Sequence, residues 1–311
     1  MKALLVNTPN NIAIDPFTVT TLANICSRLD ASGWDARYYV ADSIEGYKEI
    51  LADFRPDVTL CYDYTAGDGG VLRAVNEAMG VPDIFTDQRL LEVFLDKHRA
   101  KSVASSFGFM VPPGVVINDG SLEESVLPFT PPYMVKPVHG GDSRGIFRDN
   151  VFTQPEKAVS FAKCLRETSG DDVIVEKYIN DPSSYEFCIF MAHYRSISYC
   201  VALRYSYLIP DGQKYRYLSK EVKEDTSRYE VCLTPFLPSD PSLKMHLVEM
   251  LQGYGTFGVV KAEFIHSQEG DYLIEINGIP GLFLCFGALA SSIPLSEEHL
   301  LDDIFKAAAG L

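Results

Sequence analysis

The chain has 311 residues, of which 47% are hydrophobic and 22% charged, which is typical of a globular protein and excludes a disordered one. The formal net charge of −15 would repel a phosphate backbone, so we expect no nucleic-acid partner. The seven cysteines form no C-x-x-C pair, which favours buried, reduced thiols and a cytoplasmic location. No signal peptide and no apolar run of about 20 residues is found, so we expect no membrane partner.

The first 88 residues alternate between strand and helix patterns. Apolar runs predict strands over 2–6, 35–42 and 57–64, and amphipathic spacing predicts helices over 18–34, 44–56 and 68–82. Alternation of this kind predicts a parallel α/β layer. The glycine fingerprint of a dinucleotide site is missing after the first predicted strand.

The pattern changes after Asp96. We predict helices over 96–108, 154–170, 242–255 and 297–310, and strands over 132–138, 145–150, 172–179 and within 184–209. The run 259–278 predicts a hairpin that turns at 267–271. These segments predict α+β units with antiparallel sheets.

Ser143 lies in "GDSRG", which matches the G-x-S-x-G pattern of a nucleophile elbow. An elbow needs a helix directly after the serine, but "IFRDNVF" has a strand-like pattern. The same glycine-rich run could instead hold phosphates. Lys136 precedes it within the apolar run "YMVKPV", where a lysine needs an anionic partner.

The predicted hairpin carries the strongest cluster of polar residues. Strand alternation places Lys261 and Glu263 on one face, and Glu275 and Asn277 on one face of the next strand. If the strands pair, two carboxylates and an amide oxygen converge, and such oxygen ligands suit Mg²⁺. A solvated hairpin face is the alternative, although an acid within the apolar run "YLIEING" argues against it.

These runs occur together in an order that resembles the ATP-grasp superfamily, most closely its D-alanine–D-alanine ligase branch. The matching runs are "DKHRAKSVASSFGFMVPPGVVI", "PPYMVKPVHGGDSRGIF", "VIVEKYINDPSSYEF", "YRYLSK" and "FGVVKAEFI…YLIEINGIPGL". The resemblance implies an N-terminal α/β parallel-sheet domain over 1–95, followed by two α+β subdomains of an ATP-grasp fold over 96–180 and 181–311.

The resemblance also implies roles for particular residues, with ATP and two Mg²⁺ ions as cofactors and Mn²⁺ as an alternative ion. The residues implied to bind ATP are Lys97, Lys136, Gly140, Gly141, Ser143, Glu176, Lys177, Ile179, Glu186 and Lys220. Those implied to act in catalysis are Lys261, Ser143, Lys220 and Gly281, with Glu263, Glu275 and Asn277 as metal ligands. Ser143 then belongs to a phosphate loop rather than to an elbow.

The implied activity is an ATP-dependent ligation of a carboxylate donor to an amine acceptor through an acyl phosphate. Three features depart from the family: the acidic glycine-rich loop after the first strand is missing, Lys261 replaces an arginine, and Phe286 replaces a serine that grips a carboxylate. We therefore expect a donor in specialised metabolism that is an amino acid or small acid other than D-alanine. We expect an acceptor that lacks that carboxylate or is larger and more apolar.

Several alternatives stay open at this point. They are an intramolecular cyclo-ligase, a true D-alanine–D-alanine ligase, a nucleotide-binding protein without catalysis, and a serine hydrolase. A homodimer is a further expectation from the resemblance.

Overall fold

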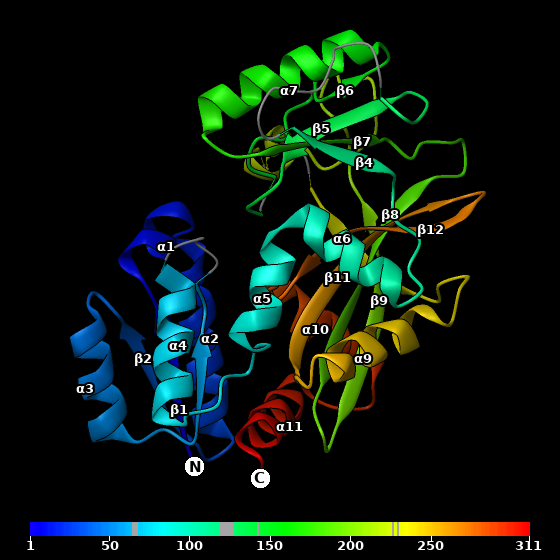
Figure 1. Cartoon of the computed structure of the whole chain (residues 1–311). Helices are drawn as coiled ribbons and strands as arrows, with labels where there is room; N and C mark the ends of the chain where they lie inside the picture. The colour runs from blue at the N-terminus through cyan, green and yellow to red at the C-terminus, as the bar shows by residue number, and fades with distance from the viewer. Residues whose placement is uncertain (64–67, 118–126, 142, 226, 229) are drawn as a thin grey trace.

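In the computed structural model the chain forms three sheets flanked by helices (Figure 1). The structure describes residues 1–63, 68–117, 127–141, 143–225, 227–228 and 230–311. The last residue of the strand predicted over 57–64 lies outside these ranges.

The N-terminal layer is a parallel sheet in the order β2-β1-β3, as the alternation predicted. Its strands are β1 (Lys2–Asn7), β2 (Asp35–Val40) and β3 (Val58–Cys61). Its helices are α1 (Pro9–Ile14), α2 (Phe17–Ala31), α3 (Ile44–Phe54) and α4 (Asp68–Met79). Helix α1 was not predicted, although Thr8 caps it and Pro9 occupies its first turn.

The second sheet is antiparallel in the order β4-β7-β5-β6, and α7 (Pro155–Ser169) covers it at the top of Figure 1. Its strands are β4 (Gly114–Ile117), β5 (Tyr133–Pro137), β6 (Val151–Phe152) and β7 (Val173–Lys177). The strand predicted over 145–150 is wrong, because this segment forms turns. The Asn150 amide donates to the carbonyls of Gly145 and Val135, both at 2.7 Å, and so takes the place of ladder bonds.

The third sheet is antiparallel in the order β10-β9-β8-β11-β12. Its strands are β8 (Tyr185–His193), β9 (Ser198–Ser206), β10 (Cys232–Phe236), β11 (Gly258–Ser267) and β12 (Gly270–Asn277). Helices α5 (Gln88–Leu95), α6 (Lys97–Ser106) and α9 (Leu243–Gly253) pack on one face. Helices α10 (Leu282–Ser292) and α11 (Glu297–Ala309) pack on the other, and α8 (Lys220–Glu224) is a short helix before β10.

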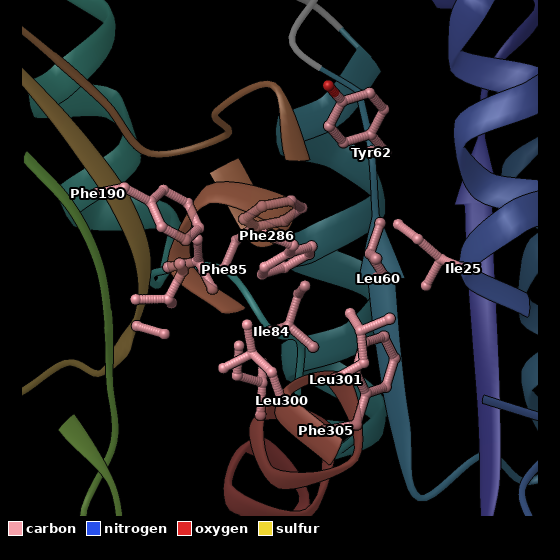
Figure 2. Close-up of a cluster of buried hydrophobic side chains, with 14 of the residues drawn as sticks. Ile25, Leu60, Tyr62, Ile84, Phe85, Phe190, Phe286, Leu300, Leu301 and Phe305 are labelled. Carbon is pink, nitrogen blue, oxygen red and sulfur yellow. The ribbon is translucent and has the colours of Figure 1, made fainter. Parts of the chain in front are cut away.

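One hydrophobic cluster joins the first sheet to the third (Figure 2). Ile25 and Leu60 of the N-terminal layer share it with Phe190, Phe286 and Phe305 from β8, α10 and α11. Each sheet lies within one of the ranges 1–95, 96–180 and 181–311, but the core crosses the boundary at 95. Those domain boundaries therefore stay a prediction.

The cysteines are only partly as expected. Cys26, Cys61 and Cys188 are buried, but Cys164 and Cys232 are exposed, and the six cysteines within the described side chains form no disulfide. Cys164 lies on the outer face of α7, where its side chain takes no part in core packing. Within the described part of the chain, no helix is long and apolar enough to cross a membrane.

Candidate functional site

A cavity of about 610 Å³ lies where the second and third sheets face each other. The hairpin β11–β12, the loop after β5, the end of β7 and the segment around α8 all contribute to its wall. The charged and amide side chains predicted on the hairpin are among its lining residues, and these are Lys261, Glu263, Glu275 and Asn277.

Strand pairing brings these four side chains together as predicted. In the antiparallel register Lys261 lies opposite Asn277, and Glu263 opposite Glu275. The alternate residues Ala262 and Phe264 are buried in the core on the other face. The pairing skips Ile274, which is a bulge directly beside Glu275, and bulges of this kind often re-aim side chains next to active sites.

Glu263 is held as a carboxylate by neighbouring lysines. Its Oε1 lies 2.6 Å from Lys261 Nζ and accepts a hydrogen bond from Asn277 Nδ2 at 3.4 Å. Burial alone would raise the pKa of Glu263, but the ammonium groups of Lys261 and Lys223 outweigh it and hold that pKa below its usual range. The site therefore keeps a negatively charged oxygen ligand at neutral pH.

Glu186 shows the opposite shift. Burial raises the pKa of its carboxyl to about 7, and the negative charge of Glu263 adds to the rise. Glu186 lines the cavity from β8, beside the hairpin. Its carboxyl therefore titrates close to neutral pH when the cavity holds no ligand.

Lys136 has the anionic partner that its apolar surroundings required. Its Nζ lies 2.5 Å from Oε1 of Glu176 on the neighbouring strand β7. Lys101, on α6, contacts the other oxygen of the same carboxylate. Burial would raise the pKa of Glu176, but the two ammonium groups outweigh it, and the pKa is lowered.

The glycine-rich loop is connected to the start of α6. Lys97 Nζ donates to the carbonyl of Gly140 at 2.5 Å, and the Lys97 backbone N–H donates to Val138 at 3.0 Å. Gly140 and Gly141 line the cavity. Gly145 has a φ of +72°, and a Cβ there would lie 2.5 Å from Pro137 Cγ, so both the backbone and the space require glycine.

Ser143 is not arranged as a hydrolase nucleophile. Its Oγ donates to the carbonyl of Leu218 at 2.9 Å, and no helix follows it. Among the described residues that line the cavity there is no histidine to act as its base. Ser143 has a φ of +54°, so its backbone takes part in the turn together with Gly140 and Gly145. The G-x-S-x-G match is thus a tight loop rather than a strand-to-helix elbow.

Most of the predicted site residues lie on this one cavity. Those that line it are Lys136, Gly140, Gly141, Ser143, Glu176, Lys177, Ile179, Glu186, Lys261, Glu263, Glu275, Asn277 and Gly281. Lys97 contacts the carbonyl of Gly140 in the loop but does not line the cavity. Lys220 is the first residue of α8 and does not line the cavity either. Lys223, less than one turn after Lys220, is the α8 lysine in the cavity wall.

Phe286 does not face the cavity. Its side chain is 1% exposed and meets the Phe190 ring edge to face at 5.6 Å in the core. The helix turns this side chain away from the cavity into the cluster of Figure 2. The expectation that the acceptor lacks a carboxylate at this place stays a prediction.

Sequence reasoning missed Asp15, Tyr62, Tyr205 and Lys223, which also line the cavity. The Tyr205 hydroxyl donates to Glu263 Oε1 at 3.4 Å and accepts from Lys261 Nζ at 3.5 Å. Its position in β9 follows from the alternation of "VALRYS", but the sequence does not reveal that β8 would lie between β9 and β11, which brings Tyr205 to Glu263. Asp15 follows α1, the helix that the analysis did not predict.

Comparison with known proteins identifies the family. The chain is 30% identical over 269 residues to a D-alanine–D-alanine ligase of Brucella anthropi, covering 83% of this chain and 78% of that protein. It is 28% identical over 298 residues to a D-alanine–D-alanine ligase of Rhizobium meliloti, covering 91% and 88%. No family model matches the sequence.

Solved structures agree on the fold. The VanG D-Ala:D-Ser ligase of Enterococcus faecalis superposes with a TM-score of 0.73 at 16% identity, covering 99% of both chains. A D-alanine–D-alanine ligase of Bacillus anthracis complexed with ATP gives 0.68 at 15% identity, covering 99% of this chain and 97% of that one. These similarities show that the chain has the ATP-grasp fold and belongs to the D-alanine–D-alanine ligase family of ATP-dependent carbon–nitrogen ligases.

Proposed function

We propose that this enzyme joins a small carboxylate to an amine through an acyl phosphate, and that the carboxylate is an amino acid or small acid other than D-alanine. One observation carries the proposal. A single cavity collects Lys136 and the glycine loop on one side, and Lys261, Glu263, Glu275 and Asn277 on the other. The first group suits the phosphates of ATP. In the second, Glu263, Glu275 and Asn277 suit a metal ion that neutralises those phosphates, and Lys261 adds a cation beside them.

The chemistry requires both groups. A carboxylate is a poor electrophile, so its oxygen first attacks the γ-phosphorus of ATP, and the bond to the β-phosphate oxygen breaks to release ADP. The amine then attacks the acyl phosphate, loses a proton, and displaces inorganic phosphate. Lysine ammonium groups stabilise the charge of the first step. A closed cavity protects the acyl phosphate from water.

The residues present fit a magnesium ion. Glu263, Glu275 and Asn277 offer two carboxylates and one amide oxygen, which are the ligands Mg²⁺ prefers. Asn277 Oδ1 lies 3.9 Å from the position a Cβ would take on Gly141, so the amide oxygen faces the glycine loop. Within the described residues, no three His, Cys, Asp or Glu side chains gather as a metal-binding group, so this site depends on the Asn277 amide as its third ligand. Bound Mg²⁺ would neutralise phosphate charge between hairpin and loop, and Mn²⁺ would suit the same ligands.

The remaining roles follow from position. The adenine would lie against Lys177 and Ile179 at the end of β7, with Glu186 near the ribose. Lys261 and the backbone N–H of Gly281 would stabilise the tetrahedral oxyanion, with Ser143 near the transferred phosphoryl group. We assign the γ-phosphate contact of α8 to Lys223 as well as Lys220, because Lys223 lines the cavity.

The substrate end of the cavity supports an amino-acid donor and an apolar acceptor. Asp15 lines it from the N-terminal layer and can pair with an ammonium group. Leu218, Val222, Val231 and Leu233 line it from the segment around α8 and β10. An acceptor that packs against these side chains would bury apolar surface at about 25 cal/mol per Å².

A true D-alanine–D-alanine ligase is the second candidate, because the relatives named above carry that name. The family's glycine-rich loop is missing after β1, and Lys261 replaces an arginine, and these two departures argue against it. The acid of that loop does not count, because Asp15 supplies a carboxylate to the cavity from the same segment. An intramolecular ligase would need only one organic substrate.

Hydroxamate formation tests the proposal. The protein is incubated with ATP, Mg²⁺, hydroxylamine and amino acids, singly and pooled, and hydroxamate and phosphate are measured. We expect an ATP-dependent signal with a donor other than D-alanine, and loss of at least about 100-fold in Glu275→Gln. A signal with D-alanine alone would establish the second candidate. ATP binding without hydroxamate or phosphate release on any acid would contradict the proposal.

A further inference from the structure

Three charged side chains form a buried cluster behind the glycine loop. Lys101, Glu176 and Lys136 are 4%, 3% and 6% exposed. Each lysine contacts a different oxygen of the one carboxylate, with Lys136 Nζ at 2.5 Å from Oε1 and Lys101 Nζ on Oε2. The carboxylate is therefore shared by two cations that come from different elements, α6 and β5.

The two lysines differ in what else they can reach. Lys136 and Glu176 line the cavity, but Lys101 does not. Lys101 also lies one helical turn after Lys97, which holds the carbonyl of Gly140. Residues four apart share one face of a helix, so α6 directs one lysine to the loop and the next to Glu176.

A phosphate in the cavity would compete with Glu176 for the ammonium group of Lys136. Lys136 would turn toward the phosphate and weaken its contact with Glu176. A buried carboxylate that loses its only cation is strongly destabilised, and it would also repel the phosphate. The contact with Lys101 prevents both effects, because Glu176 keeps a cation that is out of reach of the ligand.

We propose that Lys101 is a positioning residue for ATP, which keeps Glu176 paired so that Lys136 is free to bind the phosphates. This inference rests on the proposed function, since it takes Lys136 as a phosphate ligand. A purely structural ion pair would have a different consequence, because its loss would lower stability and leave the affinity of the folded protein for ATP unchanged.

ATP binding to the whole protein distinguishes these roles. Lys101→Met removes the charge and keeps most of the stem, while Lys157→Met makes the same change at an exposed lysine of α7. Calorimetry with ATP and Mg²⁺ should show a Kd at least about 10-fold higher for Lys101→Met, since one hydrogen bond between charged groups is lost. Lys157→Met should bind as the wild type does. At saturating ATP, kcat of Lys101→Met should stay within about threefold of wild type, because the reacting atoms lie elsewhere.

Lys101→Arg gives a second test that does not depend on the stability of Lys101→Met. Burial lowers the pKa of Lys101 to about 8, which Glu176 opposes and the ammonium groups of Lys136 and Lys97 reinforce. The Kd of the wild type for ATP should therefore rise between pH 7 and 9, as Lys101 loses its proton. Arginine stays protonated there, so the rise should be smaller in Lys101→Arg.

Two outcomes would overturn the inference. One is a folded Lys101→Met protein with the wild-type Kd for ATP, and the other is equal pH dependence in wild type and Lys101→Arg. Lys136→Met separates these from a failure of the proposed function. If Lys136→Met weakens ATP binding and Lys101→Met does not, only the role of Lys101 is wrong. If Lys136→Met binds ATP normally, the phosphate role of Lys136 fails and this inference fails with it.

Discussion

Two carboxyl groups in the same cavity have pKa values displaced in opposite directions. Glu263 is kept ionised by Lys261 and Lys223, whereas burial raises the pKa of Glu186 to about 7, and the cations Arg216 and Lys223 oppose that rise only in part. Pairs of this kind are characteristic of functional sites, because the surroundings prepare each group for a different partner. Here the ionised group suits a metal ion, and the group near neutrality suits neutral ribose hydroxyls.

The shift of Glu186 predicts a pH effect on stability. Its folded-state pKa of about 7 exceeds its ordinary value of 4.5, so the stabilisation from its proton is complete below pH 4.5 and lost as the pH rises through 7. Each unit of separation corresponds to about 1.4 kcal/mol. Urea unfolding without ATP or Mg²⁺ should thus show wild type losing stability relative to Glu186→Gln between pH 5 and 8. Glu49→Gln, at an exposed position of α3, is the control. The prediction would be contradicted if the difference in free energy of unfolding between wild type and Glu186→Gln stayed the same across this pH range.

At the residue scale, the sequence predicted which side chains share one face of a strand. Lys261, Glu263, Glu275 and Asn277 follow from alternation and a short turn alone. Tyr205 could not be found, because its contact with Glu263 requires β11, which is distant in sequence, to pair with β8 on the side opposite β9. Lys101 was missed although it lies four residues after Lys97, since a buried partner on a distant strand leaves no local pattern.

At the scale of elements, α6 connects the two halves of the cavity. The helix begins at Lys97, and Asp96 caps it by accepting from the backbone N–H groups of His98 at 2.9 Å and Arg99 at 2.8 Å. The backbone of Asp96 also forms an isolated antiparallel β-bridge with the backbone of His139, next to the glycine loop. The cap therefore fixes the helix start and the loop in one arrangement.

Removing this cap should affect ATP binding as well as stability. Asp96→Ala should lower the free energy of unfolding by about 1 kcal/mol, which is the usual cost of a lost cap. Ser296→Ala removes the corresponding cap of α11, where Ser296 Oγ accepts from His299 N–H at 3.3 Å, far along the chain from the loop. The KM for ATP should rise several-fold in Asp96→Ala only, because only α6 carries Lys97 and Lys101. Equal KM values in both variants would show that the cap has no part in placing the lysines.

The elements themselves were predicted where a single face is buried, as in α2 and α11. Predictions failed where the local sequence pattern does not determine the secondary structure. Helix α5 was missed because its eight residues make only about two turns, too few for its apolar positions to stand out as a helical period, although one face is buried. The segment 145–150 has strand-like residues, but the Asn150 side chain satisfies the backbone in a turn.

At the scale of the whole molecule, the N-terminal layer is covered by the C-terminal helix. Arg28 of α2 lies 2.8 Å from Glu297 of α11, and Trp34 Nε1 donates to Asp302 at 2.9 Å. The Trp34 and Phe305 rings meet edge to face at 5.9 Å. The first and last segments of the chain thus share one core, which Figure 1 shows at the base of the molecule, near both termini. Sequence patterns could not predict this, because each segment shows an apolar face without showing what covers it.

This shared core predicts that the layer over residues 1–95 does not unfold separately. Trp34 is the only tryptophan, so its fluorescence reports on that layer, while far-UV circular dichroism reports on the whole chain. Phe305→Ala removes a fully buried ring and should cost about 3–5 kcal/mol. Because the cluster spans both parts, the two signals should shift together in urea and keep a common midpoint. If the Trp34 transition kept its wild-type midpoint while the circular dichroism transition moved, the layer would be an independent domain, and the boundary at residue 95 would also be a boundary of cooperative unfolding.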